Sequence, residues 1–98
     1  MHIDLDEIKI EENLSEIYAM AEKSVGLMLY KDIRVSFAES CTGGLLSEII
    51  TSVPGASSVF EAGFCTYSAR IKMKILSVPE SVISETTAVS EETARHMA

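Results

Sequence analysis

Two spacings of apolar residues alternate along the chain, and they predict an ordered series of helices and strands. From Asn13, a candidate N-cap, apolar side chains recur every three or four positions, which predicts an amphipathic helix over 13–29. Apolar and polar residues then alternate over 33–38, which predicts a strand. Helical spacing returns at once over 45–53 and ends before a Pro-Gly pair.

The second half of the chain follows a similar order. Residues 59–67 are rich in aromatic and β-branched side chains and predict a second strand. Ser68 is positioned to cap a short helix over 69–76, and Ser90 is positioned to cap the last helix. Between them, 80–87 is a turn or a short helix. This order predicts an α/β fold, layered as helix/sheet/helix around a partly parallel sheet.

The first twelve residues carry scattered charges without a period, so we expect an acidic N-terminal arm over 1–12 and one domain over 13–98. Two strands are few for a stable sheet. We therefore expect the domain to be incomplete, or its sheet to be completed by another copy in a homo-oligomer.

Composition and charge narrow the function classes. The chain has 98 residues, 47% of them apolar and 23% charged, which is ordinary globular usage. Its net charge of −7 argues against a nucleic-acid partner. No apolar run approaches the ~18 residues of a membrane span, and the N-terminus is acidic where an export signal is basic. We expect a cytoplasmic protein with no membrane partner.

The segment over 39–44, Glu-Ser-Cys-Thr-Gly-Gly, is the candidate site. The predicted strand delivers Ser40 to the carboxyl end of the sheet, where ligands bind in open α/β folds. The two glycines permit a tight turn, and the following helix begins with unpaired amides that suit an oxyanion or a phosphate. An ordinary capped turn without a ligand is the alternative interpretation.

No histidine lies near the middle of the chain, so a serine nucleophile would need a lysine or a tyrosine to activate it. Tyr67 and Lys72 follow the second predicted strand, and they reach the same edge as Ser40 if the strands are parallel. The alternatives are a packing aromatic and a solvated cation. Cys41 is the rival nucleophile. It and Cys65 are expected as free thiols, and no metal-ligand spacing is present.

Several motifs together resemble one family. The stretch over 38–46, AESCTGGLL, resembles the opening of the CinA C-terminal domain family, the nicotinamide-nucleotide amidohydrolases. Further matches are VPGAS over 53–57, TYS over 66–68, Lys72, AVSE over 88–91 and ARHMA over 94–98.

The resemblance implies an amidohydrolase that converts nicotinamide mononucleotide to nicotinic acid mononucleotide and ammonia, in pyridine-nucleotide recycling. It implies Ser40 as the nucleophile, Lys72 as the base and Tyr67 as a relay or orienting group. Some members are fused to a further domain in competence/damage-inducible proteins.

The resemblance also implies that backbone amides near Thr42, Gly43 and Gly44 hold the oxyanion, with Thr42 near the substrate. Arg70, with Lys74 beside it, is expected to attract the phosphate of an anionic substrate to this acidic protein. No metal or organic cofactor is implied.

The chain departs from the family pattern at two positions and in length. Ala69 stands where asparagine is usual, and Thr87 stands where glycine is usual. Family domains continue for roughly another half, through elements that help to build the nucleotide pocket. The alternative function is therefore a non-catalytic nucleotide- or anion-binding module, or an interaction module.

Overall fold

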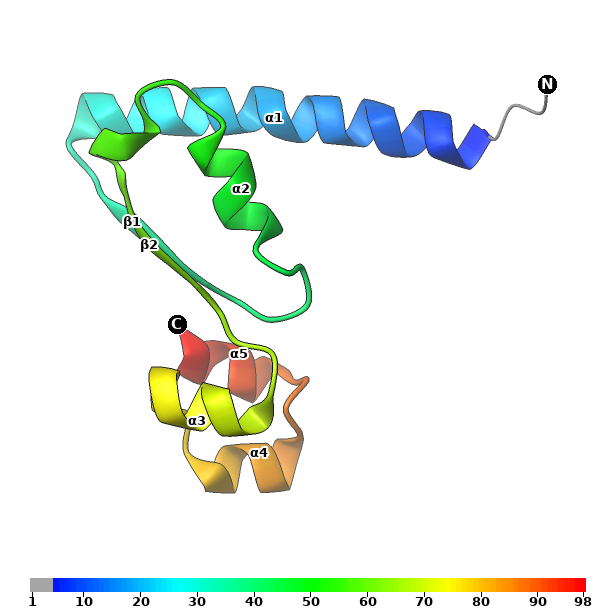
Figure 1. Ribbon diagram of the computed structural model, residues 1–98, viewed down its shortest axis with the longest axis vertical. Helices are drawn as coiled ribbons and strands as arrows, with labels where there is room; N and C mark the ends of the chain where they lie inside the picture. Colours follow the sequence, from blue (N-terminus) through cyan, green and yellow to red (C-terminus); the bar gives the residue numbers. More distant parts are fainter. Residues whose placement is uncertain (1–4) are drawn as a thin grey trace. The chain divides into compact units, whose positions relative to one another are not determined.

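The computed structural model describes residues 5–98, with side chains from residue 12 onward. Figure 1 labels the helices and strands along the chain, and a 3-10 turn, η1, precedes the second strand. Their bounds are α1 Leu5–Lys31, β1 Val35–Glu39, α2 Leu45–Thr51, η1 Ala56–Ser58, β2 Phe60–Cys65, α3 Ala69–Leu76, α4 Glu80–Thr86 and α5 Glu91–Met97.

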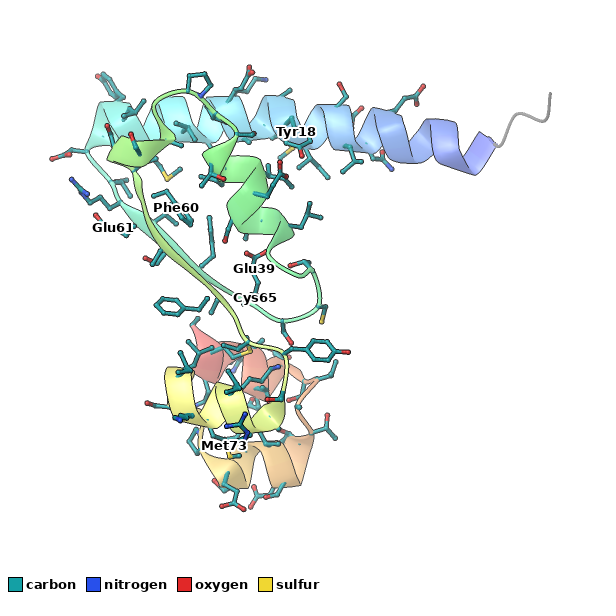
Figure 2. All side chains as sticks on the ribbon, in the orientation of Figure 1. Tyr18, Glu39, Phe60, Glu61, Cys65 and Met73 are labelled. Atoms are coloured by element: carbon teal, nitrogen blue, oxygen red, sulfur yellow. The ribbon has the colours of Figure 1, made fainter. Side chains whose placement is uncertain are left out.

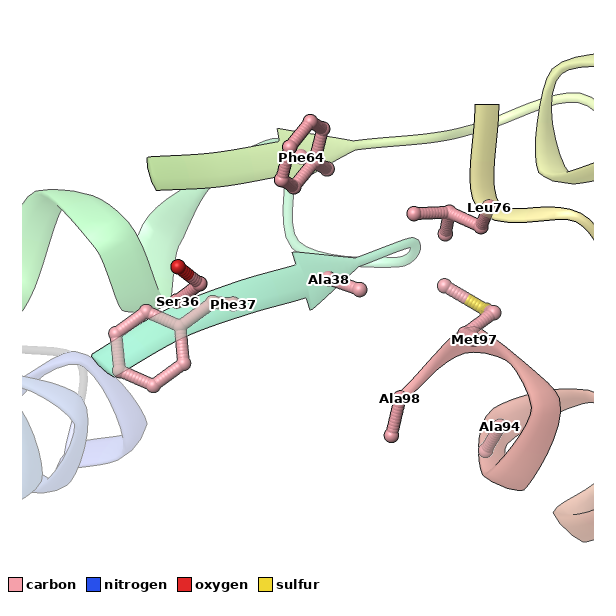
Figure 3. Close-up of a pocket in the computed structure, with 8 residues that line it drawn as sticks. All are labelled: Ser36, Phe37, Ala38, Phe64, Leu76, Ala94, Met97 and Ala98. Atoms are coloured by element: carbon pink, nitrogen blue, oxygen red, sulfur yellow. The ribbon is translucent and has the colours of Figure 1, made fainter. Parts of the chain in front are cut away.

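The two strands form a two-stranded parallel sheet, which confirms the predicted α/β class. At one end the Val35 amide donates to the Val59 carbonyl at 2.7 Å, and at the other the Thr66 amide donates to the Glu39 carbonyl at 2.9 Å. Both arrows therefore point the same way (Figure 3). As a result, β1 and β2 bring the residues that follow them to a common edge.

The chain divides into two compact units. The first combines the chain up to Val35 with Ser47–Glu61, and the second combines Ser36–Leu46 with Ala62–Ala98. Buried apolar side chains gather in the first unit: Ala21, Val25, Ile49, Ile50, Val53, Ala56 and Val59. In the second unit Val78 is buried together with four polar side chains: Glu39, Thr66, Lys72 and Thr93.

The N-terminal helix is longer than expected. The cap predicted at Asn13 is wrong, because α1 already begins at Leu5. The segment over 5–12 contains neither glycine nor proline and is mostly leucine, lysine, glutamate and isoleucine, so the helix continues through it. Residues 1–4 of the predicted arm lie outside the described residues. The boundary after residue 12 stays a prediction.

The helices of the second unit begin where their caps were expected. The Ser68 hydroxyl accepts the Ile71 amide at 3.2 Å to start α3, and the Ser90 hydroxyl accepts the Thr93 amide at 3.1 Å to start α5. The stretch over 80–87, left open between turn and helix, contains α4. Helix α5 contacts both α3 and α4.

No helix among the described residues has the length and apolar character needed to cross a membrane.

Candidate active site

Ser40 lies directly after β1, at the start of the turn that leads into α2. Two glycines with positive φ make this turn possible, Gly43 at 66° and Gly44 at 97°. A side chain in the left-handed region costs about 1–2 kcal/mol per residue, so glycine is the favoured residue at both positions. The turn therefore depends on the Gly-Gly pair that the sequence analysis singled out.

A cavity in the second unit brings together the three predicted catalytic residues and the rival nucleophile Cys41. Its volume is about 460 Å³, and its lining consists of Ser40, Cys41, Tyr67, Lys72, Ala88 and Val89. Ser40 and Cys41 come from the turn after β1, whereas Tyr67 and Lys72 come from the segment that follows β2. The common edge of a parallel sheet accounts for this meeting of residues distant in sequence.

Lys72 is not the solvated helix cation that the sequence left as an alternative. Its side chain is 1% exposed, and its Nζ donates to the carbonyl oxygens of Thr66 and Tyr67, each at 2.8 Å. Among the described residues, no carboxylate lies within ion-pair distance of this amine. The amine is thus held by two backbone carbonyls at the end of β2.

Tyr67 contributes to the cavity in two ways. Its side chain is 84% exposed and forms part of the lining, while its carbonyl anchors Lys72. Among the described residues its hydroxyl makes no hydrogen bond. The relay role expected for that hydroxyl remains a prediction.

The amides of Cys41, Thr42 and Gly43 differ from the Leu46 amide of α2 in their partners. Within the described part of the chain, the amides of Cys41, Thr42 and Gly43 donate to no other group of the protein. In contrast, the Leu46 amide in the first turn of α2 donates to the Glu39 carboxylate at 2.6 Å. The amides that remain for a ligand are therefore those of the turn.

Glu39 is the residue of this region to which the sequence analysis assigned no role. Its carboxylate also accepts the Thr42 hydroxyl at 2.8 Å, and its side chain is buried. Figure 2 labels Glu39 near the end of the strands. The available signal was an acidic residue ending a strand just before a helix N-terminus, where a negative charge is stabilised.

Arg70 is exposed on α3 and does not line the cavity of Ser40 and Lys72. The structure thus brings Ser40, Cys41, Tyr67 and Lys72 together. The other predicted site residues lie outside this lining, namely Thr42, Gly43, Gly44 and Arg70. The attraction of a phosphate by Arg70 stays a prediction. Both cysteines are free and exposed.

Thr87, where the family pattern has glycine, adopts a conformation that favours glycine. Its φ is 74° and its ψ is 162°. Its carbonyl accepts the Thr93 hydroxyl at 2.7 Å and the Ser90 hydroxyl at 3.1 Å, and its amide donates to the Ile83 carbonyl at 2.9 Å. These bonds hold the backbone just before Ala88, which lines the cavity.

A second cavity of about 430 Å³ lies in the same unit (Figure 3). Its lining is Ser36, Phe37, Ala38, Phe64, Leu76, Ala94, Met97 and Ala98, none of which is ionisable. It therefore offers no acid or base for catalysis. Among the described side chains there is also no group of three or more His, Cys, Asp or Glu residues that could hold a metal ion.

Comparison with known proteins identifies the family. The family model of the CinA C-terminal domain matches residues 17–98. The chain belongs to the CinA C-terminal domain family. This confirms the resemblance drawn from the motifs.

Curated relatives carry the same family name or a related one. A CinA-like protein of Akkermansia muciniphila is 49% identical over 81 residues, which are 82% of this chain and 20% of the relative. A relative in Caldicellulosiruptor bescii, named for competence and damage induction, is 51% identical over 98 residues, or 94% of this chain and 24% of the relative. The chain thus spans about a quarter of the length of these CinA relatives.

Solved structures of CinA proteins share the fold. The competence/damage inducible protein CihA from Agrobacterium tumefaciens aligns with a TM-score of 0.82 at 36% identity, over 84% of this chain and 50% of that one. A CinA superfamily protein from Escherichia coli aligns with a TM-score of 0.81 at 34% identity, over 84% of this chain and 48% of that chain. This chain therefore has the α/β fold of about half of each solved CinA chain.

Proposed function

We propose that this CinA-family chain carries the catalytic residues of an amidohydrolase that deamidates nicotinamide mononucleotide to nicotinic acid mononucleotide. The observation that supports the proposal most directly is the shared cavity of Ser40 and Lys72. A hydroxyl and a buried amine at one site suit a serine nucleophile with a lysine base. Since the chain spans only part of its relatives, the activity of the whole protein is part of this proposal.

The two carbonyl bonds of Lys72 suit the role of base. An uncharged amine has two N–H groups and one lone pair, whereas the ammonium ion has three N–H groups and no lone pair. The carbonyls of Thr66 and Tyr67 match two N–H groups. In the uncharged state the lone pair is then left to accept the proton of Ser40.

The proposed reaction is acyl transfer. Ser40 Oγ attacks the carboxamide carbon while its proton passes to Lys72, and the carbonyl π electrons move to the oxygen. The amides of Cys41, Thr42 and Gly43 stabilise that oxyanion, an effect worth about 3–4 kcal/mol per donor in other enzymes. The tetrahedral intermediate collapses, the C–N bond breaks, and Lys72 returns the proton to the departing ammonia. Water then attacks the acyl-enzyme and releases the acid and Ser40.

Family membership supports the choice of substrate, and the two-stranded sheet supports assembly with a second copy. We propose a nicotinamide nucleotide as the ligand, a homo-oligomer as the assembly and the cytoplasm as the compartment. Arg70 and Lys74, both exposed on α3, supply positive charge in an acidic protein and would attract a phosphate.

One observation favours a second candidate function. The turn amides of Cys41, Thr42 and Gly43 donate to no other group among the described residues, and such amides suit an anion. A binding module built on this glycine turn would bind the nucleotide or another anion without converting it.

Replacement of Ser40 by alanine tests the main proposal. We expect Ser40→Ala to abolish formation of nicotinic acid mononucleotide, because no hydroxyl remains to form the acyl-enzyme. Mass spectrometry measures the product. Cys41→Ala is the matched control, since it changes the next residue of the same cavity, and it should retain turnover. The reverse result would make Cys41 the nucleophile, and nucleotide binding without turnover in the unmodified chain would favour the binding module.

A further inference from the structure

The last residue of β1, directly before Ser40, is a buried carboxylate that the proposed reaction does not use. Glu39 is 6% exposed, although glutamate is almost never fully buried without partners. Its Oε1 accepts the Thr42 hydroxyl at 2.8 Å and the Leu46 amide at 2.6 Å. These two donors lie on either side of the Gly43-Gly44 pair, so the carboxylate closes the turn across its two glycines.

The backbone of Glu39 is also connected to Lys72. Its carbonyl accepts the Thr66 amide at 2.9 Å, and the Thr66 carbonyl accepts Lys72 Nζ at 2.8 Å. Two hydrogen bonds, joined through the backbone of Thr66, therefore connect Glu39 to the amine of Lys72. A change in the position of Glu39 would alter the geometry of both groups.

We propose that Glu39 is a positioning residue for the reaction given above, and this inference rests on that proposed function. Its carboxylate holds the turn so that the Ser40 hydroxyl and the amides of Cys41, Thr42 and Gly43 keep their geometry relative to Lys72. It also occupies the Leu46 amide of α2, so this amide is not available to the oxyanion. The bonds from Thr42 and Leu46 need only an acceptor oxygen, which glutamine also has, so a glutamine at position 39 should preserve these two bonds.

Two substitutions of Glu39 in the full chain distinguish the loss of its hydrogen-bond acceptor from the loss of its negative charge. In Glu39→Ala we expect the Leu46 amide to exchange with solvent about tenfold faster or more, measured by NMR, because its acceptor is gone. We also expect kcat on nicotinamide mononucleotide to fall about tenfold to a hundredfold, since misplaced catalytic groups cost rates of this order. KM should change by less than about threefold if only the reacting geometry is lost.

Glu39→Gln should remain close to the unmodified chain in both Leu46 exchange and kcat. Glu85→Ala is the matched control, because it removes an exposed carboxylate from α4. It should change neither quantity. A KM and kcat that stay normal in Glu39→Ala while Leu46 exchanges rapidly would overturn the inference. So would a Glu39→Gln variant as slow as Glu39→Ala, since charge rather than a positioned acceptor would then matter.

Two further outcomes keep the test decisive. If thermal melting shows that Glu39→Ala does not fold, Glu39→Asp replaces it, because the shorter side chain keeps the charge and cannot span the same two donors. Rapid Leu46 exchange with an unchanged kcat in that variant would equally overturn the inference. An unmodified chain without any turnover would count against the proposed function, and the Leu46 exchange rates alone would then decide whether Glu39 holds the turn.

Discussion

At the scale of single residues, the conformation of Thr87 carries a stability cost that its hydrogen bonds offset. A residue other than glycine in this region of φ and ψ costs about 1–3 kcal/mol and persists when its surroundings determine its position. Thr93, whose side chain is buried, and Ser90 both donate to the Thr87 carbonyl. The strain lies next to Ala88 and Val89 in the proposed active site.

This strain can be measured by comparing two substitutions that both remove the Thr87 hydroxyl. We expect Thr87→Gly to be more stable than Thr87→Ala by about 1 kcal/mol, because only alanine keeps a Cβ in the strained region. The measurement is the free energy of unfolding in urea. Ala88→Gly is the control at a neighbouring residue without positive φ, and it should lose about 0.5–1 kcal/mol. Equal stability of the two Thr87 variants would show that this conformation carries no strain.

At the scale of elements, a hydrogen bond joins α1 to α2 within the first unit. The Tyr18 hydroxyl donates to Glu48 Oε2 at 2.7 Å, and Tyr18 is labelled in Figure 2. This bond raises the pKa of Tyr18 above its ordinary value of 10.0, with smaller contributions from burial and the charge of Glu48. A raised pKa means that the folded chain holds this proton more tightly than the unfolded chain.

The raised pKa of Tyr18 predicts how the stability of the chain depends on pH. The contribution of the bond is fully present below the unfolded pKa, about 10, and is lost as the pH rises through the higher folded value. We expect the unmodified chain to lose more stability between about pH 9 and 11 than Tyr18→Phe does, measured as the urea midpoint at each pH. Tyr30→Phe changes a highly exposed tyrosine of the same helix and should leave the pH profile unaltered. Parallel profiles for Tyr18→Phe and the unmodified chain would contradict the prediction.

At the scale of the whole molecule, the buried apolar residues and the proposed chemistry fall in different units. The first unit contains most of the buried apolar side chains, whereas the second contains Lys72, Glu39 and the cavity of Ser40. Buried polar groups contribute little net stability even when they are satisfied. The apolar core of the first unit should therefore dominate the stability of the chain.

Truncation of a core residue tests this distribution. We expect Ile50→Ala to lower the free energy of unfolding by about 2–5 kcal/mol, because it removes buried methylene groups and leaves a cavity. Leu27, which is 54% exposed on α1, gives the control. Leu27→Ala should lie within about 0.5 kcal/mol of the unmodified chain. Circular dichroism during chemical denaturation measures the free energy of unfolding of both variants. Similar losses of stability in the two variants would contradict the assignment of the core.

The sequence by itself determined the α/β class, the caps at Ser68 and Ser90 and the family, because these depend on local spacing, capping chemistry and contiguous motifs. It misplaced the start of α1, since the helix continues through residues 5–12 that lack a charge or hydrophobic period.

Only the tertiary structure decided which groups meet at the candidate site. The meeting of Ser40 and Cys41 with Tyr67 and Lys72 in one cavity depends on the parallel pairing of β1 with β2. Local sequence carries no signal for such contacts, because residues more than 20 positions apart come together only when the sheet forms. The strained backbone of Thr87 is held by the hydroxyls of Ser90 and Thr93, which the folded second unit brings to its carbonyl.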